Sequence, residues 1–418
     1  MKHKIAAIFL LLSVLSSCGE NSRKQSGDTS ESEGSAMVAK LSSDEIPVID
    51  LNKKYPIKKI ILQDIADIEY IPLETRADIL VEGSKLAYFS DKSFITYNIG
   101  HGDIFIFDSK TGKLNSKFNN TGRGDKEYNQ ILDVAYDEES GEVYVSSYYR
   151  NAILVYSEEG KFLRHLPLRG DMIIERLYNY SADLLLAYNR FYGESEMKDI
   201  NQQNPYLFLS KRDGNIVSRL ETNYSNRLSK SKMISISETS QITIVSSSNN
   251  VLKYSDELII ADFASDTIFS YTDRGELIPL FIRTPSVWGE ALIESSIEMK
   301  IKRLLFFSAT PMGSEYLKDM VNKRGIGGFK IDGVDFMFDI KSREIFIPEI
   351  SNSHSTSGFA NYSINEADMA VKDVSVSLIN SYQLVESLNK GELSGPLKEM
   401  AEMISEDDNP VLMVVRFK

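Results

Sequence analysis

A short apolar run, a polar turn that contains glycine, and a second apolar run recur along the middle of this chain. The run at residues 104–107 precedes a turn at Thr111-Gly112, and the run at 153–156 precedes a turn at Glu159-Gly160. Phe107 and Tyr156, which end these runs, are 49 residues apart. Further copies are the runs at 206–209 and 267–271, with turns at 212–214 and 273–275. Such runs, bounded by Gly and Asp, are typical of antiparallel strands.

The unit is most complete between residues 132 and 166. It has four β-prone runs, at 132–136, 143–146, 153–156 and 161–166, separated by polar turns. This pattern predicts one antiparallel sheet of four strands. A single sheet of this size cannot bury both of its faces, so repeated copies stack around an axis. The sequence therefore predicts an all-β fold, a β-propeller.

The same segment carries a family resemblance. Residues 122–128 (GRGDKEY), followed by LDVAYD, EVYVS and RNAILVYSEEGKF, resemble an NHL-repeat blade. The chain also resembles the six-bladed β-propeller lipoproteins of Gram-negative envelopes in its leader, in the stretch 60–74 with IEYIPLE, and in its C-terminal NPVLMVVRFK. The match is strong over two blades and degenerate elsewhere. Ser147 stands where the NHL pattern usually has Asp, so no role of that Asp is carried over.

Chain length and helical insertions decide between six and seven blades. The 373 residues from Ile46 to Lys418 would give about 62 residues per blade for six blades and about 53 for seven. The 49-residue spacing alone favours seven. We expect a helical insertion near 288–323, because residues 289–307 have apolar residues at mixed helical spacing. We expect a second insertion at 381–404, as two short helices separated by residues 391–396. Subtracting them favours six blades, with seven as the alternative.

The N-terminus predicts export and lipid anchoring. Lys2 and Lys4 precede an apolar run at 5–15, which suits a signal peptide and is too short to span a bilayer. Leu15-Ser16-Ser17-Cys18 resembles a lipobox, which predicts a signal peptide at 1–17 and a lipidated Cys18. The alternative is an ordinary signal peptide with a chance cysteine. We expect a protein anchored to the outer membrane of a Gram-negative cell, on a face that the sequence does not specify.

The amino-acid composition distinguishes an N-terminal tether from the folded domain. Residues 21–40 are rich in Ser, Gly, Glu and Asp, so we expect residues 18–45 to be a disordered tether and 46–418 to be the propeller. Loss of Lys2 and Lys4 with the leader changes the formal charge from −13 to −15. An acidic surface argues against nucleic acid as a partner. The expected partners are the membrane, through the lipid, and an unknown glycan, peptide or protein.

The two chain ends have the features needed to close a ring. Residues 411–415 (VLMVV) form a β-branched apolar run, and similar runs occur at 57–62 and 68–71. An open ring would expose sheet edges that invite aggregation. We therefore predict that 411–417 is an inner or middle strand, in a sheet with an N-terminal strand from within 57–73.

Strand alternation sorts the connections onto two faces. Loops between blades, and loops between the second and third strands of a blade, lie on one face, which we call the loop face. The tight hairpins 137–141, 158–160, 212–214 and 273–275 lie on the other, the hairpin face, and are expected to be structural. The loop face gathers tyrosine and arginine, which suit a polar ligand. The candidate ligand-binding residues are His101, Arg123, Glu127, Tyr128, Tyr149, Arg150 and Asn151. The alternative is that Arg123 ties neighbouring blades together and that Gly122 and Gly124 only permit the turn.

The sequence predicts no catalytic residue, metal ligand or cofactor. His101, His165 and His354 are far apart in the chain, and there is no HExxH motif, cysteine pair or G-x-S-x-G. Asp133 and Asp262 are expected to be solvated or turn residues. Calcium held by loop Asp and Asn side chains has no EF-hand loop to support it.

These features favour an envelope-anchored binding propeller without its own catalysis. The alternative is a lactonase-like or lyase-like propeller enzyme with an axial, metal-assisted site. Two or more acidic residues that converge with Asn or His at the axis would favour the enzyme. An apolar axis with a rim of aromatic and arginine side chains would favour binding.

Overall fold

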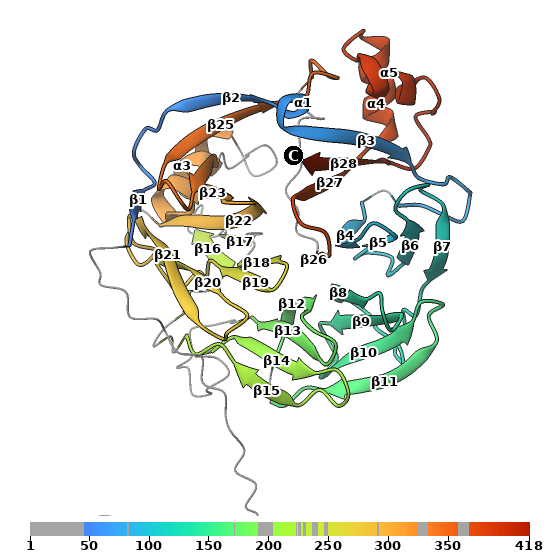
Figure 1. Ribbon diagram of the computed structural model, residues 1–418. Helices are drawn as coiled ribbons and strands as arrows, with labels where there is room; N and C mark the ends of the chain where they lie inside the picture. Colours follow the sequence, from blue (N-terminus) through green and yellow to red (C-terminus); the bar gives the residue numbers. More distant parts are fainter. Residues whose placement is uncertain are drawn as a thin grey trace, which may run out of the picture. The chain divides into compact units, whose positions relative to one another are not determined.

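Six small sheets follow one another around a ring in the computed structural model, which makes the fold a six-bladed β-propeller (Figure 1). The structure describes residues 46–418 apart from 82, 171, 191–203, 223, 225–226, 229–230, 236–240, 246–249, 291, 325–332 and 358–367. The predicted fold class is confirmed, with six blades and not seven. The signal peptide and tether predicted for residues 1–45 lie outside the described residues.

The first three blades each contain four consecutive antiparallel strands. Blade 1 comprises β4 (Lys85–Phe89), β5 (Ser93–Tyr97), β6 (Ile104–Asp108) and β7 (Leu114–Phe118). Blade 2 comprises β8 (Ile131–Asp137), β9 (Glu142–Ser147), β10 (Ala152–Ser157) and β11 (Phe162–Pro167). Blade 3 comprises β12 (Ile174–Asn179), β13 (Leu184–Asn189), β14 (Tyr206–Ser210) and β15 (Ile216–Arg219).

The later blades recruit strands from the N-terminal part of the chain. Blade 4 comprises β18 (Val251–Tyr254), β19 (Glu257–Ile260), β20 (Thr267–Tyr271) and β21 (Leu277–Thr284). Blade 5 comprises β22 (Ile293–Ile301), β23 (Leu304–Pro311), β24 (Val334–Asp339) and β25 (Ile345–Ser351). Blade 6 comprises β27 (Val374–Ile379), β28 (Val411–Phe417) and β3 (Ala66–Pro72). A separate hairpin, β16 (Ser231–Ser235) with β17 (Gln241–Val245), comes between blades 3 and 4 in the chain.

The recurring motif of the sequence is the third strand of a blade and the turn that follows it. Its four copies are β6, β10, β14 and β20. The turn glycines at 112, 160, 214 and 275 have φ between +67° and +79°, a backbone conformation that favours glycine. β10 is apolar throughout because its side chains face alternate neighbours. Leu154 and Tyr156 pack in the core shared with blade 1, whereas Ile153 and Val155 pack in the core shared with blade 3.

β28 closes the ring as the middle strand of blade 6. Val411 is paired with Ile379 of β27 on one side and with Pro72 of β3 on the other. Residues 411–415 are at most 1% exposed. The predicted pairing of 411–417 with an N-terminal strand is confirmed.

The N-terminal segment 48–72, which we call the N-terminal belt, pairs with three blades in turn (Figure 1). β1 (Val48–Asp50) is parallel to β21 of blade 4, and β2 (Ile57–Ile61) is parallel to β25 of blade 5. The short helix α1 (Leu62–Ile65) then leads into β3 of blade 6. The belt thus adds a fifth, outermost strand to blades 4 and 5.

The helix expected at 289–307 is wrong, because this segment forms β22 and the first half of β23. The register of β22 shifts between Ile297 and Met299, so side chains on either side of the shift face different cores. Ile293 and Ile297 pack toward blade 4, and Met299 and Ile301 pack toward the belt and blade 6. The bulge breaks the alternation that identifies a strand. The insertion near 288–323 does hold a helix, α3 (Ser314–Arg324).

The two helices expected at 381–404 are present as α4 (Ser381–Asn389) and α5 (Gly395–Ala401). They connect β27 to β28, and Leu384 and Leu397 are fully buried in a core shared with β28. No helix among the described residues has the length and apolar composition needed to cross a membrane.

Candidate functional site

Three loops of blades 1 and 2 form one continuous surface on the loop face. The loop between β7 and β8 contacts the β5–β6 loop, because Asn119 Nδ2 donates a hydrogen bond to the His101 carbonyl at 2.8 Å. Its other side contacts the β9–β10 loop, where the Arg150 guanidinium donates to the Gly124 carbonyl. The structure therefore brings the loops of His101, Arg123 and Arg150 together, although they come from different connections.

Tyr128 is a structural residue, and we correct the prediction that it contacts a ligand. Its side chain is fully buried, and its hydroxyl donates to the Gly102 carbonyl at 2.7 Å. Burial also raises the pKa of Tyr128. Its ring lies edge-on to Tyr156, with centroids 5.8 Å apart. A side chain buried in this way has no exposed surface that a ligand could contact.

Glu127 closes its own turn. Its carboxylate accepts a hydrogen bond from the Gly124 N–H at 2.7 Å. A Cβ at position 122 would lie 1.9 Å from Glu127 Oε2, so a larger residue at Gly122 would displace the Glu127 carboxylate from this turn. This contact supports the structural explanation for Gly122 that the sequence left open.

Blade 2 fastens the β7–β8 loop through three successive carbonyls. Arg150 donates to Gly124 O, His165 Nε2 lies 2.6 Å from Asp125 O, and the Tyr156 hydroxyl donates to Lys126 O at 2.8 Å. Arg150 is half-buried and its Nε has no acceptor. Arg150 thus ties neighbouring blades, the role that the sequence considered for Arg123.

The remaining candidates are exposed on this surface. They are His101, Arg123, Tyr149 and Asn151. Tyr149 is 69% exposed, and its ring lies edge-on to the ring of Tyr148, with centroids 4.9 Å apart. We call the surface formed by His101, Arg123, Tyr148, Tyr149 and Asn151 the loop-face patch.

The sequence did not predict a buried polar network beneath the loop face of blades 3 and 4. Asp262, expected to be a solvated or turn residue, begins a turn in which its carboxylate accepts the Ala264 N–H at 2.8 Å. It is not solvated, because it is 1% exposed and also accepts a hydrogen bond from the Tyr206 hydroxyl at 2.6 Å. Arg283 is 1% exposed, and its Nη2 donates to the carbonyls of Asp262 and Ser265. Burial lowers the pKa of Arg283. The only feature of the sequence that could have indicated this network is an Asp or Arg directly after an apolar strand run.

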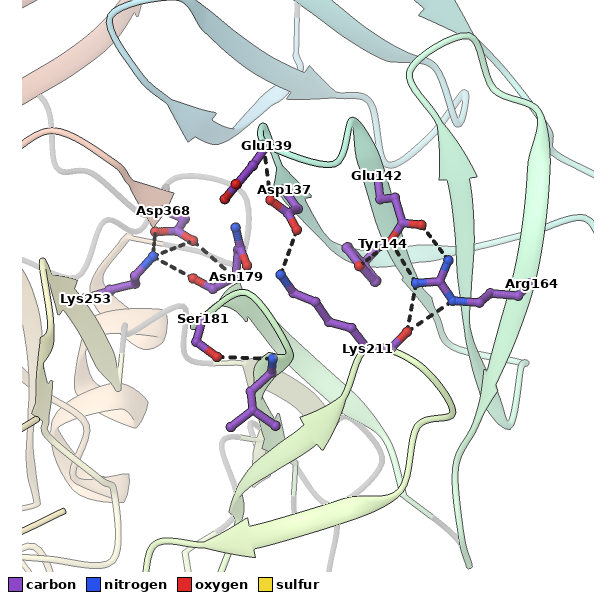
Figure 2. Close-up of polar contacts among 11 residues, drawn as sticks. Asp137, Glu139, Glu142, Tyr144, Arg164, Asn179, Ser181, Lys211, Lys253 and Asp368 are labelled. Atoms are coloured by element: carbon purple, nitrogen blue, oxygen red, sulfur yellow. Dashed lines mark hydrogen bonds and ion pairs between the residues drawn. The ribbon is translucent and has the colours of Figure 1, made fainter.

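A second polar cluster lies at the inner edges of the blades (Figure 2). The short strand β26 (Asp368–Met369) pairs with β4 of blade 1 and contacts β18 of blade 4, so it crosses the centre of the ring. Lys253 Nζ lies 3.1 Å from Asp368 Oδ1 and donates to the Asn179 carbonyl at 2.6 Å. The Asp368 carboxylate also accepts the Asn179 N–H at 3.1 Å. The charge of this axial aspartate is therefore neutralised by a lysine.

Asp133, on the innermost strand of blade 2, is buried and not solvated as expected. Its carboxylate accepts hydrogen bonds from the Tyr97 hydroxyl at 3.1 Å and the Leu177 N–H at 2.8 Å. Burial raises the pKa of Asp133 to about 6, although the charge of Arg176 opposes this shift. Asp133 thus joins blades 1, 2 and 3.

The described residues contain no group of three or more His, Cys, Asp and Glu side chains that could hold a metal ion.

An open groove of about 280 Å³ lies on the hairpin face, against blade 4. The β18–β19 turn and the β20–β21 turn form its walls together with the loop that precedes β27. Its lining residues are Tyr254, Ser255, Asp256, Glu257, Thr272, Asp273 and Lys372. The hairpins of this face were predicted to be structural.

Comparison with solved structures agrees with the six-bladed fold. A Bacteroides fragilis protein described as exported matches with a TM-score of 0.59 and 13% identity, over 89% of this chain and 99% of its own. A DUF4221 family member from Bacteroides vulgatus has a TM-score of 0.47 and 9% identity, over 85% of this chain and 97% of its own. Likeness at 13% identity shows the fold alone. The NHL-repeat and lipoprotein resemblances stay predictions.

No curated protein matches this sequence. A family model does match, over residues 46–416, which is nearly the whole propeller. The chain therefore belongs to the family described as a domain of unknown function, DUF4934.

Proposed function

We propose that this protein is an envelope-anchored lipoprotein that binds a glycan, peptide or protein ligand through its loop face, without catalysis of its own. One observation carries the proposal. Tyr148 and Tyr149 form an exposed pair of rings in the same patch as the cationic side chain of Arg123. Tyrosine and arginine are the side chains most enriched at the centres of binding interfaces.

The rigidity of the patch supports this role. Arg150, His165 and Tyr156 hold three successive carbonyls of the β7–β8 loop. A loop fixed in this way loses little conformational entropy when a ligand binds. The structural anchors thus present Arg123 and Tyr149 in one arrangement.

The N-terminal leader supports the cellular location. The charged start, the apolar run and Cys18 are the parts of a lipoprotein signal. The Bacteroides fragilis neighbour is described as exported, which accords with a location outside the cytoplasm. Anchoring to the outer membrane is part of the proposal.

The alternative, a lactonase-like or lyase-like enzyme, has no specific observation in its favour among the described residues. Of the axial carboxylates, Asp368 is paired with Lys253, and Asp133 accepts hydrogen bonds from Tyr97 and Leu177.

The test is a glycan array and a peptide array probed with the full-length protein and with Tyr149→Ala and Arg123→Ala variants. We expect at least one ligand class to bind and each variant to lose about tenfold in affinity, the usual effect of truncating a central interface side chain. The melting temperature should stay within error of the parent because both side chains are exposed.

Lys161→Ala is the matched control, because Lys161 is exposed on the β10–β11 hairpin of the hairpin face. It should bind as the parent protein does. Equal binding by all three variants, or arrays without any ligand, would contradict a binding role for the loop-face patch.

A further inference from the structure

The hairpin-face groove gathers charged side chains of both signs that have no ion-pair partner among the described residues. In blades 2 and 3, Lys211 Nζ lies 2.8 Å from Asp137 Oδ2, and Arg164 binds both Glu142 oxygens, at 2.5 and 2.7 Å (Figure 2). These two ion pairs hold the charged groups of blades 2 and 3 against one another.

Three charged side chains in the groove have no such partner among the described residues. Asp273 and Lys372 form no side-chain hydrogen bond or ion pair, and Asp256 accepts only a 3.3 Å hydrogen bond from the adjacent Ser255 hydroxyl. Glu257, the fourth charged lining residue, is paired with Lys300. The groove therefore offers two carboxylates on the blade 4 hairpins and one ammonium group on the loop before β27.

The charges of Asp256 and Asp273 both affect the ionisation of Tyr180. The pKa of Tyr180, at the neighbouring hairpin of blade 3, is raised to about 12, mainly by burial and also by the charges of Tyr271, Asp256 and Asp273. Both carboxylates therefore lie within electrostatic range of Tyr180.

Residues with positive φ also cluster at the hairpin-face groove. Among the described residues, four non-glycine residues have positive φ, and three of them, Ser255, Lys302 and Asp373, meet here. Asp373 Oδ1 accepts hydrogen bonds from the Tyr254 hydroxyl at 2.8 Å and from the Lys302 N–H at 2.7 Å. Side-chain-bearing residues in this conformation cost free energy, and such residues concentrate at ligand sites.

We propose that the hairpin-face groove binds a small zwitterion, a free amino acid or short peptide, with its ammonium group at Asp256 and Asp273 and its carboxylate at Lys372. The two opposite charges of such a ligand match the unpaired groups on the two walls. The groove volume of about 280 Å³ suits a molecule of this size. The site lies on the face opposite the loop-face patch, so it is independent of the function proposed above.

A small pocket next to the groove indicates which ligand side chain would fit. A cavity of about 20 Å³ shares Tyr254, Ser255 and Lys372 with the groove and is lined by Met299 and Met369, among other apolar residues. This volume is little more than the space one water molecule requires. We therefore expect a methyl-sized side chain to be preferred and choose alanyl-alanine as the probe.

Isothermal titration calorimetry of the full-length protein with alanyl-alanine tests the site. N-acetyl-alanyl-alanine lacks the ammonium group, and alanyl-alanine amide lacks the carboxylate. Each capped peptide should bind at least about tenfold more weakly, because it loses one charge-assisted hydrogen bond. Absence of binding by the free peptide at concentrations up to about 10 mM, or equal binding by the capped peptides, overturns the proposal.

Variants connect the binding to the named residues. Asp273→Asn and Lys372→Met should each weaken alanyl-alanine binding about tenfold or more. Asp213→Asn is the matched control, because Asp213 occupies the equivalent β14–β15 hairpin of blade 3. It should leave the affinity unchanged. Thermal melts verify that each variant is folded, and folded variants that retain full affinity overturn the proposal.

Discussion

At the scale of single residues, buried carboxylates determine how this protein responds to pH. Asp133 is 7% exposed and accepts hydrogen bonds from Tyr97 and the Leu177 N–H. Burial disfavours its charged form, so its pKa rises from 3.8 to about 6 in the folded protein. The unfolded chain therefore releases this proton at a lower pH than the folded chain does.

The Asp133→Asn variant should reveal this linkage. Between about pH 4 and pH 6 the folded state retains the proton and the unfolded state does not, so the contribution of Asp133 to stability falls as pH rises. The parent protein should lose on the order of 3 kcal/mol relative to the variant over this window. Urea unfolding of both proteins at pH 4, 5, 6 and 7 measures the difference.

Comparison with the variant cancels the titration of all other groups. Asparagine is close in shape to aspartate and does not titrate, so only the pH dependence is informative and not the absolute stability. If the parent and the variant differ by the same amount at pH 4 and pH 7, Asp133 does not have a raised pKa.

The residue scale is also where prediction from the sequence is weakest. Asp133 and Asp262 were expected to be solvated or turn residues, because nothing local distinguishes a buried aspartate from an exposed one. Their partners, Tyr97 and Tyr206, belong to neighbouring blades and are set by the stacking of the sheets. Tyr128 was taken for a ligand contact for the same reason, since its burial depends on Tyr156 of the next blade.

At the scale of elements, periodicity predicted the strands wherever hairpins are regular. The recurring strand and glycine-containing turn identified the third strands of four blades, because each is followed by a turn that contains a glycine with positive φ. Prediction failed at β22, where a bulge reverses the faces of the strand. The apolar spacing of four and then two residues, from Ile293 to Ile297 to Met299, resembles neither a regular strand nor a regular helix.

β28 is the element on which closure of the ring depends. Deletion of residues 411–418 removes the middle strand of blade 6 and leaves β27 and β3 without partners. Because residues 411–415 are at most 1% exposed, we expect the shortened protein to lose cooperative unfolding completely, in contrast to the trimming of a tail. Circular dichroism melts and size-exclusion chromatography measure the result.

Deletion of Phe417 and Lys418 alone is the control, because it leaves the paired residues 411–416 in place. This shorter deletion should keep a cooperative transition. A soluble, monomeric 411–418 deletion protein with the melting transition of the parent would show that the ring closes without β28.

At the scale of the whole molecule, the chain is an acidic ring whose predicted attachment is at one end. Cys18 is the only cysteine of the sequence, so no disulfide stabilises the propeller. Its stability has to come from burial between blades, as the fully buried cores of blades 1 to 3 illustrate.

The Cys18→Ala variant tests the attachment. Without the acylated cysteine the protein should be released from membranes, because the apolar run at 5–15 is too short to span a bilayer. Fractionation and detergent partitioning measure the change. Ser17→Ala keeps a small residue before the cysteine and should remain attached. A Cys18→Ala protein that still fractionates with membranes would exclude the lipid anchor.

The N-terminal belt has a consequence for the order in which the chain folds. β1, β2 and β3 are synthesised first, but their partners β21, β25 and β28 lie progressively closer to the C-terminus. Blades 2 and 3 need only local hairpins and can form early. The N-terminal belt can pair only after the C-terminal strands have been synthesised. Folding should therefore be slow, and folding intermediates should expose unpaired strand edges until β28 is in place.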